Sequence, residues 1–341
     1  MSFLILPFAG KTSATTESFK YSHHCKQLSD SILYKVIVTT LKQRSQFAGN
    51  FIAGFFINLI KGLINESDKS TSETLRSKSK IKLISFHVPT HLKPTTDNDF
   101  GHYLAGLIDG DGHFSSAMQL VIVFHSLDAS LAYYIKERLG FGNVRKVKNK
   151  KAVILVISKR EGILKVLSLI NGKIRSHNKL DQINKNIFSN SYYSLQNTTL
   201  AFDINVDQDL NNGWLAGFSD ADGSFQIKLI NKIKTEVRLN FQIDQKNKDL
   251  LLLIKNFLGG NIGFRKSKNT YYYGSTSFGS AYNVINYFDH FHLLSSKHIN
   301  YLKWRKAYIC IQNREHLKDL GLEKITKLKN TMNRNNLDTL D

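Results

Sequence analysis

The stretch "YLAGLIDGDGHF", residues 103–114, is an apolar run that ends in two acids and two glycines. A second stretch, "WLAGFSDADGSF", repeats the pattern at residues 214–225. Aligning the two places Asp111 on Asp222, at an offset of 222 − 111 = 111 residues. Charged groups are unfavourable at the end of a buried helix unless a partner compensates them. The repeated acidic end therefore needs a chemical reason, and the repeat organises the chain.

Two further matches extend the repeat beyond this motif. Residues 133–146 correspond to 251–266, and residues 176–184 correspond to 295–303 at an offset of 295 − 176 = 119 residues. Self-similarity of this kind indicates a duplicated structural unit. The predicted parts of the chain are an N-terminal extension (1–96) that matches no part of the repeat, a first repeat (97–188), a linker (189–210), a second repeat (211–312) and a basic C-terminal helix and tail (313–341).

Each copy reads as helix, strands, helix, strands, helix, which predicts an α+β fold. In the second copy, residues 236–243 alternate apolar and polar side chains, as expected of a half-buried strand with a polar outer face. Residues 248–260 predict a helix that ends at a Gly-Gly pair, and residues 269–278 predict another strand. The first copy repeats this with strands at 118–125 and 151–158 and a closing helix at 179–188.

The charge of the chain points to a polyanionic partner. It has 47 Lys and Arg against 27 Asp and Glu, a net charge of +20. Such a surplus is typical of proteins that bind nucleic acid or an anionic membrane. The apolar stretch at 47–64 is interrupted by two Asn and one Lys, so a buried or interfacial helix is as consistent with it as a membrane span. Cys25 and Cys310 form no CxxC pair, which argues against a zinc ribbon or a disulfide framework.

The repeated motif predicts a metal site between two helix ends. Small residues allow the two motif helices to pack closely; they are Ala105, Gly106, Ala216 and Gly217. Packing would bring together the negative ends of both helix dipoles. Asp111 and Asp222 at those ends would then suit a divalent cation that takes oxygen ligands, activates water and stabilises an attacked phosphate. The preceding acids, Asp109 and Asp220, are interpreted as turn-forming residues.

The sequences "LAGLIDGDG" and "LAGFSDADG" resemble the motif of LAGLIDADG homing endonucleases and intron maturases. The resemblance implies two tandem αββαββα repeats, here in one chain that acts as a monomeric pseudo-dimer. It implies a pseudo-twofold saddle over double-stranded DNA with the motif helices at the central interface. It also implies that Asp111 and Asp222 bind catalytic Mg²⁺, for which Mn²⁺ can substitute, and that Gly110 and Ala221 lend backbone carbonyls.

The resemblance implies accessory residues that the two copies supply unequally. Members of the family often carry a Gln after the second strand and a Lys before the last helix, which here match Gln245 and Lys297. In the first copy the aligned positions hold Ser126 and Asn178, with Lys179 adjacent. This departure puts equal cutting of the two DNA strands in doubt.

The outward faces of the strands and their loops are the predicted DNA surface. Arg, Asn and Gln on a β-ribbon can reach base edges in the major groove, whereas Lys mostly contacts phosphate. The candidates are Gln119, Arg145, Lys146, Lys148, Gln226, Lys228, Lys232, Lys234, Arg238, Asn240, Gln242, Arg265, Lys266 and Lys268.

The predicted function is an intron-encoded, site-specific endonuclease that makes a metal-dependent double-strand break in a long asymmetric DNA target. A group I intron RNA maturase, alone or as a second activity, is the alternative, because basic charge does not separate DNA from RNA partners. A catalytically silent DNA-binding repressor is the weakest reading, since nothing would then require the acids. No small-molecule substrate is expected. Richness in Ile, Asn, Lys, Phe and Tyr with only 3 Pro suggests an AT-rich coding genome. Together with the resemblance, this favours an organelle, the mitochondrion, and an extension read from an upstream exon or intron leader.

Overall fold

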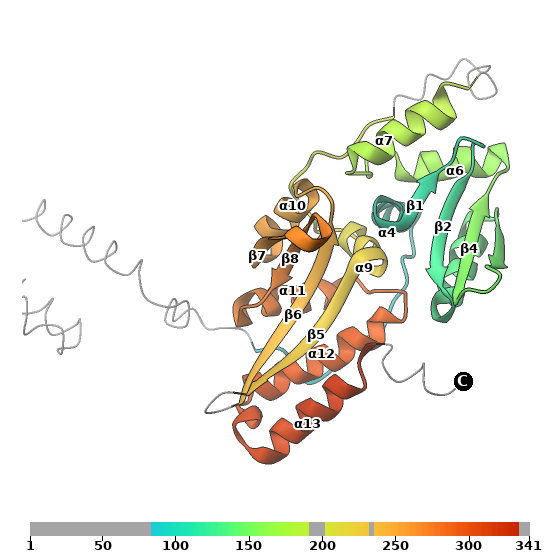
Figure 1. Cartoon of the computed structure of the whole chain (residues 1–341). Coiled ribbons are helices and arrows are strands. Elements are labelled where there is room, and N and C mark those ends of the chain that lie inside the picture. Colours follow the sequence, from blue (N-terminus) through green and yellow to red (C-terminus); the bar gives the residue numbers. More distant parts are fainter. Residues whose placement is uncertain (1–82, 191–201, 232–234, 334–341) are drawn as a thin grey trace, which may run out of the picture. The chain divides into compact units, whose positions relative to one another are not determined.

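The computed structural model describes residues 83–190, 202–231 and 235–333, all of which belong to one compact unit of the chain (Figure 1). Lys232, Lys234, Cys25 and the apolar stretch at 47–64 lie outside the described residues. Within those residues, no helix combines the length and the hydropathy needed to cross a membrane.

The first repeat is a four-stranded antiparallel sheet with helices. Its strands follow the order β1-β2-β4-β3. Its elements are α4 (Asp97–Asp111), β1 (Gly112–Phe114), β2 (Leu120–His125), η4 (Ser126–Asp128), α5 (Ala129–Leu139), β3 (Asn143–Lys146), β4 (Ala152–Ile157), α6 (Arg160–Ile170), α7 (His177–Ile183) and the π-helix η5 (Asn184–Phe188).

The second repeat has the same topology, with strand order β5-β6-β8-β7. The duplicated α+β fold is therefore confirmed. Its elements are α9 (Trp214–Asp222), β5 (Gly223–Asn231), β6 (Thr235–Gln245), α10 (Asp249–Leu258), β7 (Asn261–Arg265), η6 (Lys266–Lys268), β8 (Thr270–Ser275), α11 (Phe278–His290), α12 (Lys297–Gln312), η7 (Glu315–Leu317) and α13 (Asp319–Asn330).

Each sheet buries one face against its helices, as the alternating sequence predicts. In the second repeat, Phe225 of β5 lies opposite Phe241 of β6 and the two rings stack at 4.9 Å. Phe288 of α11 and Trp304 of α12 pack edge-on against Phe225, at 5.6 Å in both cases. All four side chains are buried, so the helices are held to the sheet by an aromatic core.

Each repeat also contains a helix that the sequence reading missed. These helices, α6 and α11, lie between the second pair of strands and the closing helix. Their apolar residues recur at the i, i+3, i+4, i+7 spacing of an amphipathic helix. The buried members are Ile163, Val166, Leu167 and Ile170 in α6, and Ala281, Val284, Ile285 and Phe288 in α11.

The part of the extension that the structure describes is tied to the second repeat without forming a helix or strand. The backbone N–H of Ile84 donates to the Gln312 side chain at 2.9 Å, and the Gln312 amide donates back to the Ile84 carbonyl at 3.0 Å. Arg305 of α12 donates to the His87 carbonyl. Ile84 and His87 thus contact α12, and further along the segment the carbonyls of Pro94 and Thr95 accept from Tyr134 and Arg138 of α5.

Candidate active site

The two motif helices, α4 and α9, pack with their backbones in direct contact. A Cβ added at Gly106 would lie 1.8 Å from the carbonyl oxygen of Trp214, and one added at Gly217 would lie 1.9 Å from that of Tyr103. Ala105 and Ala216, one position earlier, are buried. The structure therefore places Gly106 and Gly217 at the interface, where only glycine fits, whereas an interface role for Ala105 and Ala216 stays a prediction.

Two crossed hydrogen bonds join the motif helices. The Tyr103 hydroxyl donates to Asp220 Oδ2 at 2.7 Å, and the Trp214 indole N–H donates to Asp109 Oδ2 at 2.8 Å. Because Tyr103 aligns with Trp214 and Asp109 with Asp220, the two bonds are equivalent under the repeat. The interpretation of Asp109 and Asp220 as turn-forming acids is wrong: both are buried inside their helices and link one repeat to the other.

The same two acids hold the start of the closing helices. Asp109 accepts backbone N–H groups from Arg175 at 2.8 Å and Ser176 at 3.2 Å, just before α7. Asp220 accepts those of Leu294 at 2.7 Å and Ser295 at 3.3 Å, just before α12. Burial raises the pKa of Asp109 to about 6, although its N–H partners act in the opposite direction. These contacts fix where α7 and α12 begin relative to the motif helix ends.

Asp111 and Asp222 come together at the C-terminal ends of α4 and α9. A Cβ added at Gly110 would lie 2.3 Å from Ala221 Cβ and 3.0 Å from Asp222 Oδ2, so the residues before the acids also meet. Burial, together with the negative charge of Asp111, raises the pKa of Asp222 to about 6. Burial likewise raises the pKa of Asp111. Two carboxylates held this close favour a bound cation.

The donor set fits a hard divalent cation that also binds substrate. Among the described residues, no group of three His, Cys, Asp or Glu side chains could hold a metal by itself. Two carboxylates with neighbouring backbone carbonyls leave coordination positions open. Mg²⁺ typically binds in this way, through one or two carboxylates together with water and substrate phosphates. Asp111 and Asp222 would hold the cation.

Lys297 lies at the first turn of α12 against the end of α9. Its ammonium donates to the carbonyl of Ala221 at 2.6 Å and to that of Ser219 at 3.2 Å. Burial lowers the pKa of Lys297, while the charges of Asp220, Asp111 and Asp222 raise it. The predicted use of the Ala221 carbonyl as a metal ligand stays a prediction; in this structure the carbonyl accepts from the Lys297 ammonium.

The first repeat has a corresponding lysine that the alignment did not select. Lys179 of α7 is 9% exposed and donates to the carbonyl of Gly112, directly after α4. Burial lowers the pKa of Lys179, and the charges of Asp109, Asp222 and Asp111 only partly oppose this. The aligned residue, Asn178, is instead bonded to Gln182 at 3.5 Å. Asp109 binds the N–H groups of Arg175 and Ser176 as Asp220 binds those of Leu294 and Ser295, so the offset of 119 residues holds at the two helix starts. Lys179 therefore approaches the end of α4 from one position after the residue that aligns with Lys297.

The accessory glutamine, in contrast, occurs in one repeat only. Gln245 donates to Asp222 Oδ2 at 2.6 Å. The sheet register pairs Gly112 with Ile122 and Gly223 with Ile243, so the residue equivalent to Gln245, two positions further on, is Phe124. Assigning Ser126 to this position was wrong by two residues, because the first repeat inserts η4 between β2 and α5.

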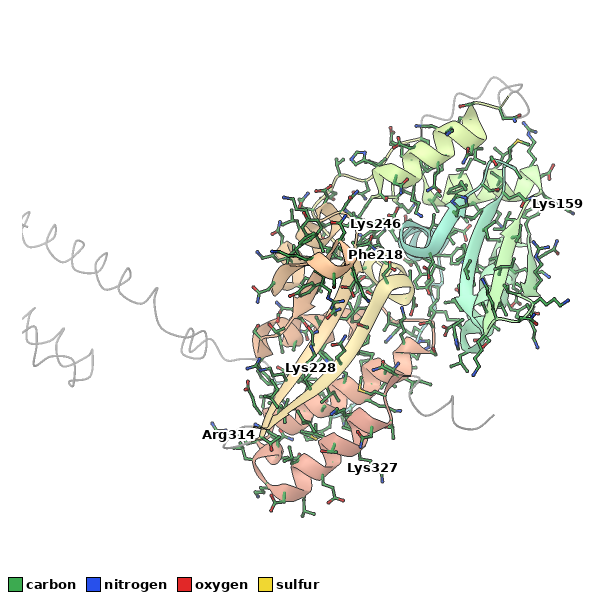
Figure 2. The ribbon with its side chains drawn as sticks, in the orientation of Figure 1. Lys159, Phe218, Lys228, Lys246, Arg314 and Lys327 are labelled. Carbon is green, nitrogen blue, oxygen red and sulfur yellow. The ribbon has the colours of Figure 1, made fainter. Side chains whose placement is uncertain are left out.

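The predicted DNA surface is largely solvent-exposed, with a covered polar row on β6. Lys228 of β5 is exposed (Figure 2), as are the side chains of Arg145, Lys146, Lys148, Arg238, Lys266 and Lys268. Gln119, Gln226 and Arg265 are half-buried. Arg238 pairs with Glu236 at 2.7 Å and Arg265 with Asp244 at 3.2 Å.

Asn240 and Gln242 were expected to face outward and be accessible, yet each is only 6% exposed. They lie on the polar face, but their amides are hydrogen-bonded in a row. Asn240 donates to Gln242 at 3.2 Å and Gln242 donates to Asp244 at 2.8 Å. Neighbouring side chains and these bonds cover them, so reaching a base would require the row to open.

Comparison with known proteins agrees with this geometry. The family model for "LAGLIDADG endonuclease" matches residues 104–188 and 215–308. A cox1 intron-2 protein of Schizosaccharomyces pombe is 53% identical over 96% of this chain and 97% of its own length. The intron-encoded DNA endonuclease aI3 and the intron-encoded RNA maturase bI4, both of Saccharomyces cerevisiae, are each 30% identical, over 62% and 54% of this chain. The chain spans 64% and 28% of those two relatives.

A solved structure shares the fold. The LAGLIDADG meganuclease I-CpaMI bound to uncleaved DNA has a TM-score of 0.54 and 19% identity, covering 69% of this chain and 99% of that one.

Proposed function

Because this chain belongs to the LAGLIDADG endonuclease family, we propose that it makes a site-specific double-strand break in DNA with a divalent metal, Mg²⁺. The observation that carries the proposal is the meeting of Asp111 and Asp222 at the ends of two packed helices, each end accepting a hydrogen bond from a lysine ammonium. Two neighbouring carboxylates repel each other when both are ionised, and a bound cation removes this repulsion. Such a pair is therefore typical of a functional site.

The residues around the two acids have separate tasks. Asp111 and Asp222 hold the cation, which when bound supplies the positive charge that activates water and stabilises the attacked phosphate. Lys297 and Lys179 hold ammonium groups at the motif helix ends, where they offset negative charge and would stabilise charge that develops on a leaving oxygen. Gln245 fixes the Asp222 carboxylate by its hydrogen bond at 2.6 Å.

The carboxylate of Asp111, in the first repeat, is held by fewer side chains than that of Asp222 in the second. Phe124 stands where Gln245 stands in the second repeat and is buried in the core. Among the described residues, the Asp111 carboxylate has no counterpart of the bond from Gln245. We infer that the two strands are cut at unequal rates, so a nicked duplex accumulates before the double-strand product.

The similarity to a cox1 intron-2 protein suggests the target. We propose that the chain is encoded within a mitochondrial intron, acts in the mitochondrion, and cuts the uninterrupted exon junction of the host gene. The experiment uses a duplex that spans this intron-less cox1 junction, incubated with the purified chain and Mg²⁺. Specific cutting that is lost in Asp111→Asn and Asp222→Asn, but kept in the exposed control Asp181→Asn, supports the proposal. Wild-type protein that leaves this duplex intact in both Mg²⁺ and Mn²⁺ refutes it.

A maturase activity is the second candidate, favoured by the similarity to the RNA maturase bI4. It would use the basic surface and would not need the metal acids. Its test is splicing of the host intron RNA in the presence of Asp111→Asn. Splicing that depends on the chain but not on this acid supports the second activity, and splicing unaffected by the chain refutes it.

A further inference from the structure

The outer face of the first repeat's sheet, opposite the core, is apolar. Val121 and Val123 of β2 lie there beside Ile154 and Val156 of β4, in the register pairs Val121–Val156 and Val123–Ile154. Val123 is 48% exposed and the other three are half-buried. We call these four side chains the valine face. Contiguous exposed apolar side chains of this kind mark interaction sites.

The second repeat carries different chemistry at the same positions. The pairs Gly112–Ile122 and Gly223–Ile243 fix the equivalence of the two sheets, so Val121 corresponds to Gln242 and Val123 to Asp244. Those two polar residues are hydrogen-bonded to each other at 2.8 Å. The duplicated fold therefore presents one hydrogen-bonding face and one apolar face.

The surroundings of the valine face fit DNA as its occupant. Strand β1, which begins directly after Asp111, pairs with β2 at Val121, so the face starts beside the proposed cleavage centre. On its other side, Arg145 of β3 lies opposite Ile154. Exposed Lys146 and Lys148 follow on the same edge. Cations at the border suit phosphates, while an apolar centre suits the C5-methyl groups of thymine, which line the major groove.

We propose that the first repeat recognises thymine methyl groups through the valine face, so the half-site it covers is rich in T·A pairs, whereas the second repeat recognises its half-site by hydrogen bonds. This inference rests on the proposed DNA endonuclease function. It also predicts a preference for DNA over RNA on this side, because uracil lacks the methyl group.

The test replaces thymidine by deoxyuridine in the DNA, which removes only the C5-methyl group of the base. Binding of the full chain to the cox1 junction duplex is measured in Ca²⁺ with all thymines of one half-site, or of the other, replaced. We expect about fourfold weaker binding for each buried methyl lost in the first repeat's half-site, and less than a twofold change in the other half-site. Val123→Thr should remove the sensitivity, while the matched control Val206→Thr, at a site 77% exposed and away from the sheet, should keep it.

The outcomes separate this inference from the proposed function. Wild-type protein that binds and cuts the duplex with no methyl sensitivity in either half overturns the inference alone, and leaves the face to an RNA, a protein or another segment of the chain. Val123→Thr that weakens binding to thymine and deoxyuracil duplexes equally shows a structural role, which also overturns it. Absence of specific DNA binding by the wild type overturns both.

Discussion

Replacing Gly106 with alanine tests whether close backbone approach holds the two repeats together. The added Cβ would lie 1.8 Å from the Trp214 carbonyl oxygen, whereas ordinary contact begins at 3.4 Å, so the helices must separate by about 3.4 − 1.8 = 1.6 Å. This stretches the bonds from Tyr103 to Asp220 and from Trp214 to Asp109, which are now 2.7 and 2.8 Å long. Each hydrogen bond to a charged group contributes ~1.5–3 kcal/mol, so we expect a loss of roughly 3–6 kcal/mol.

The assay is thermal unfolding of the purified chain followed by circular dichroism. A loss of that size lowers the Tm by roughly 6–24 °C for a unit of this length. The matched control is Gly279→Ala in α11, where an added Cβ meets nothing within 4 Å. This change should stay within about 1 kcal/mol of the wild type, since alanine favours a helix over glycine. A Gly106→Ala chain with wild-type Tm and cleavage would refute the account of the interface.

Three other predictions concern the acids and the lysines. In metal-free buffer, Asp222 keeps its proton to about pH 6 when folded but loses it near 3.8 when unfolded, so the free energy of unfolding should fall as pH rises between these values. Asp222→Asn should make that fall smaller in pH-dependent denaturation and leave the part that comes from Asp109, whose pKa is raised in the same way. Mg²⁺ should raise the Tm of the wild type and not that of Asp111→Asn, and equal shifts would place the cation elsewhere. Lys179→Met should slow cutting of one strand and accumulate nicked plasmid on a gel, whereas Asn178→Ala should not; a reversed result would restore the original alignment.

The sequence predicted the parts of the fold that rest on local pattern. The duplicated motif identified the motif helices and their small residues, and alternation identified the strands. Helices α6 and α11 were also visible in the i, i+3, i+4, i+7 spacing of Ile163 to Ile170 and Ala281 to Phe288, but the assumed order of elements left no place for them. Here the information was present in the pattern and was not used.

The role of Asp109 could not be predicted in the same way. Its partner Trp214 lies 105 residues away in the other repeat, and no local pattern reports such a contact. The fixed offset between copies also misassigned the position equivalent to Gln245. An insertion between β2 and α5 moved the true equivalent of Gln245 to Phe124, which only the sheet register reveals.

The crossed hydrogen bonds bear on how such repeats can be exchanged between proteins. Each aromatic donor belongs to one repeat and its acid acceptor to the other, so Tyr103 must travel with Asp220, and Trp214 with Asp109. A hybrid nuclease assembled from halves of two different chains keeps each half's own acid but changes the aromatic residue that meets it. Whether two halves are compatible therefore depends on these two hydrogen-bonded pairs and on Gly106 and Gly217 beside them. A design that keeps these residues matched would exchange the DNA-binding sheets and leave the helix interface unchanged.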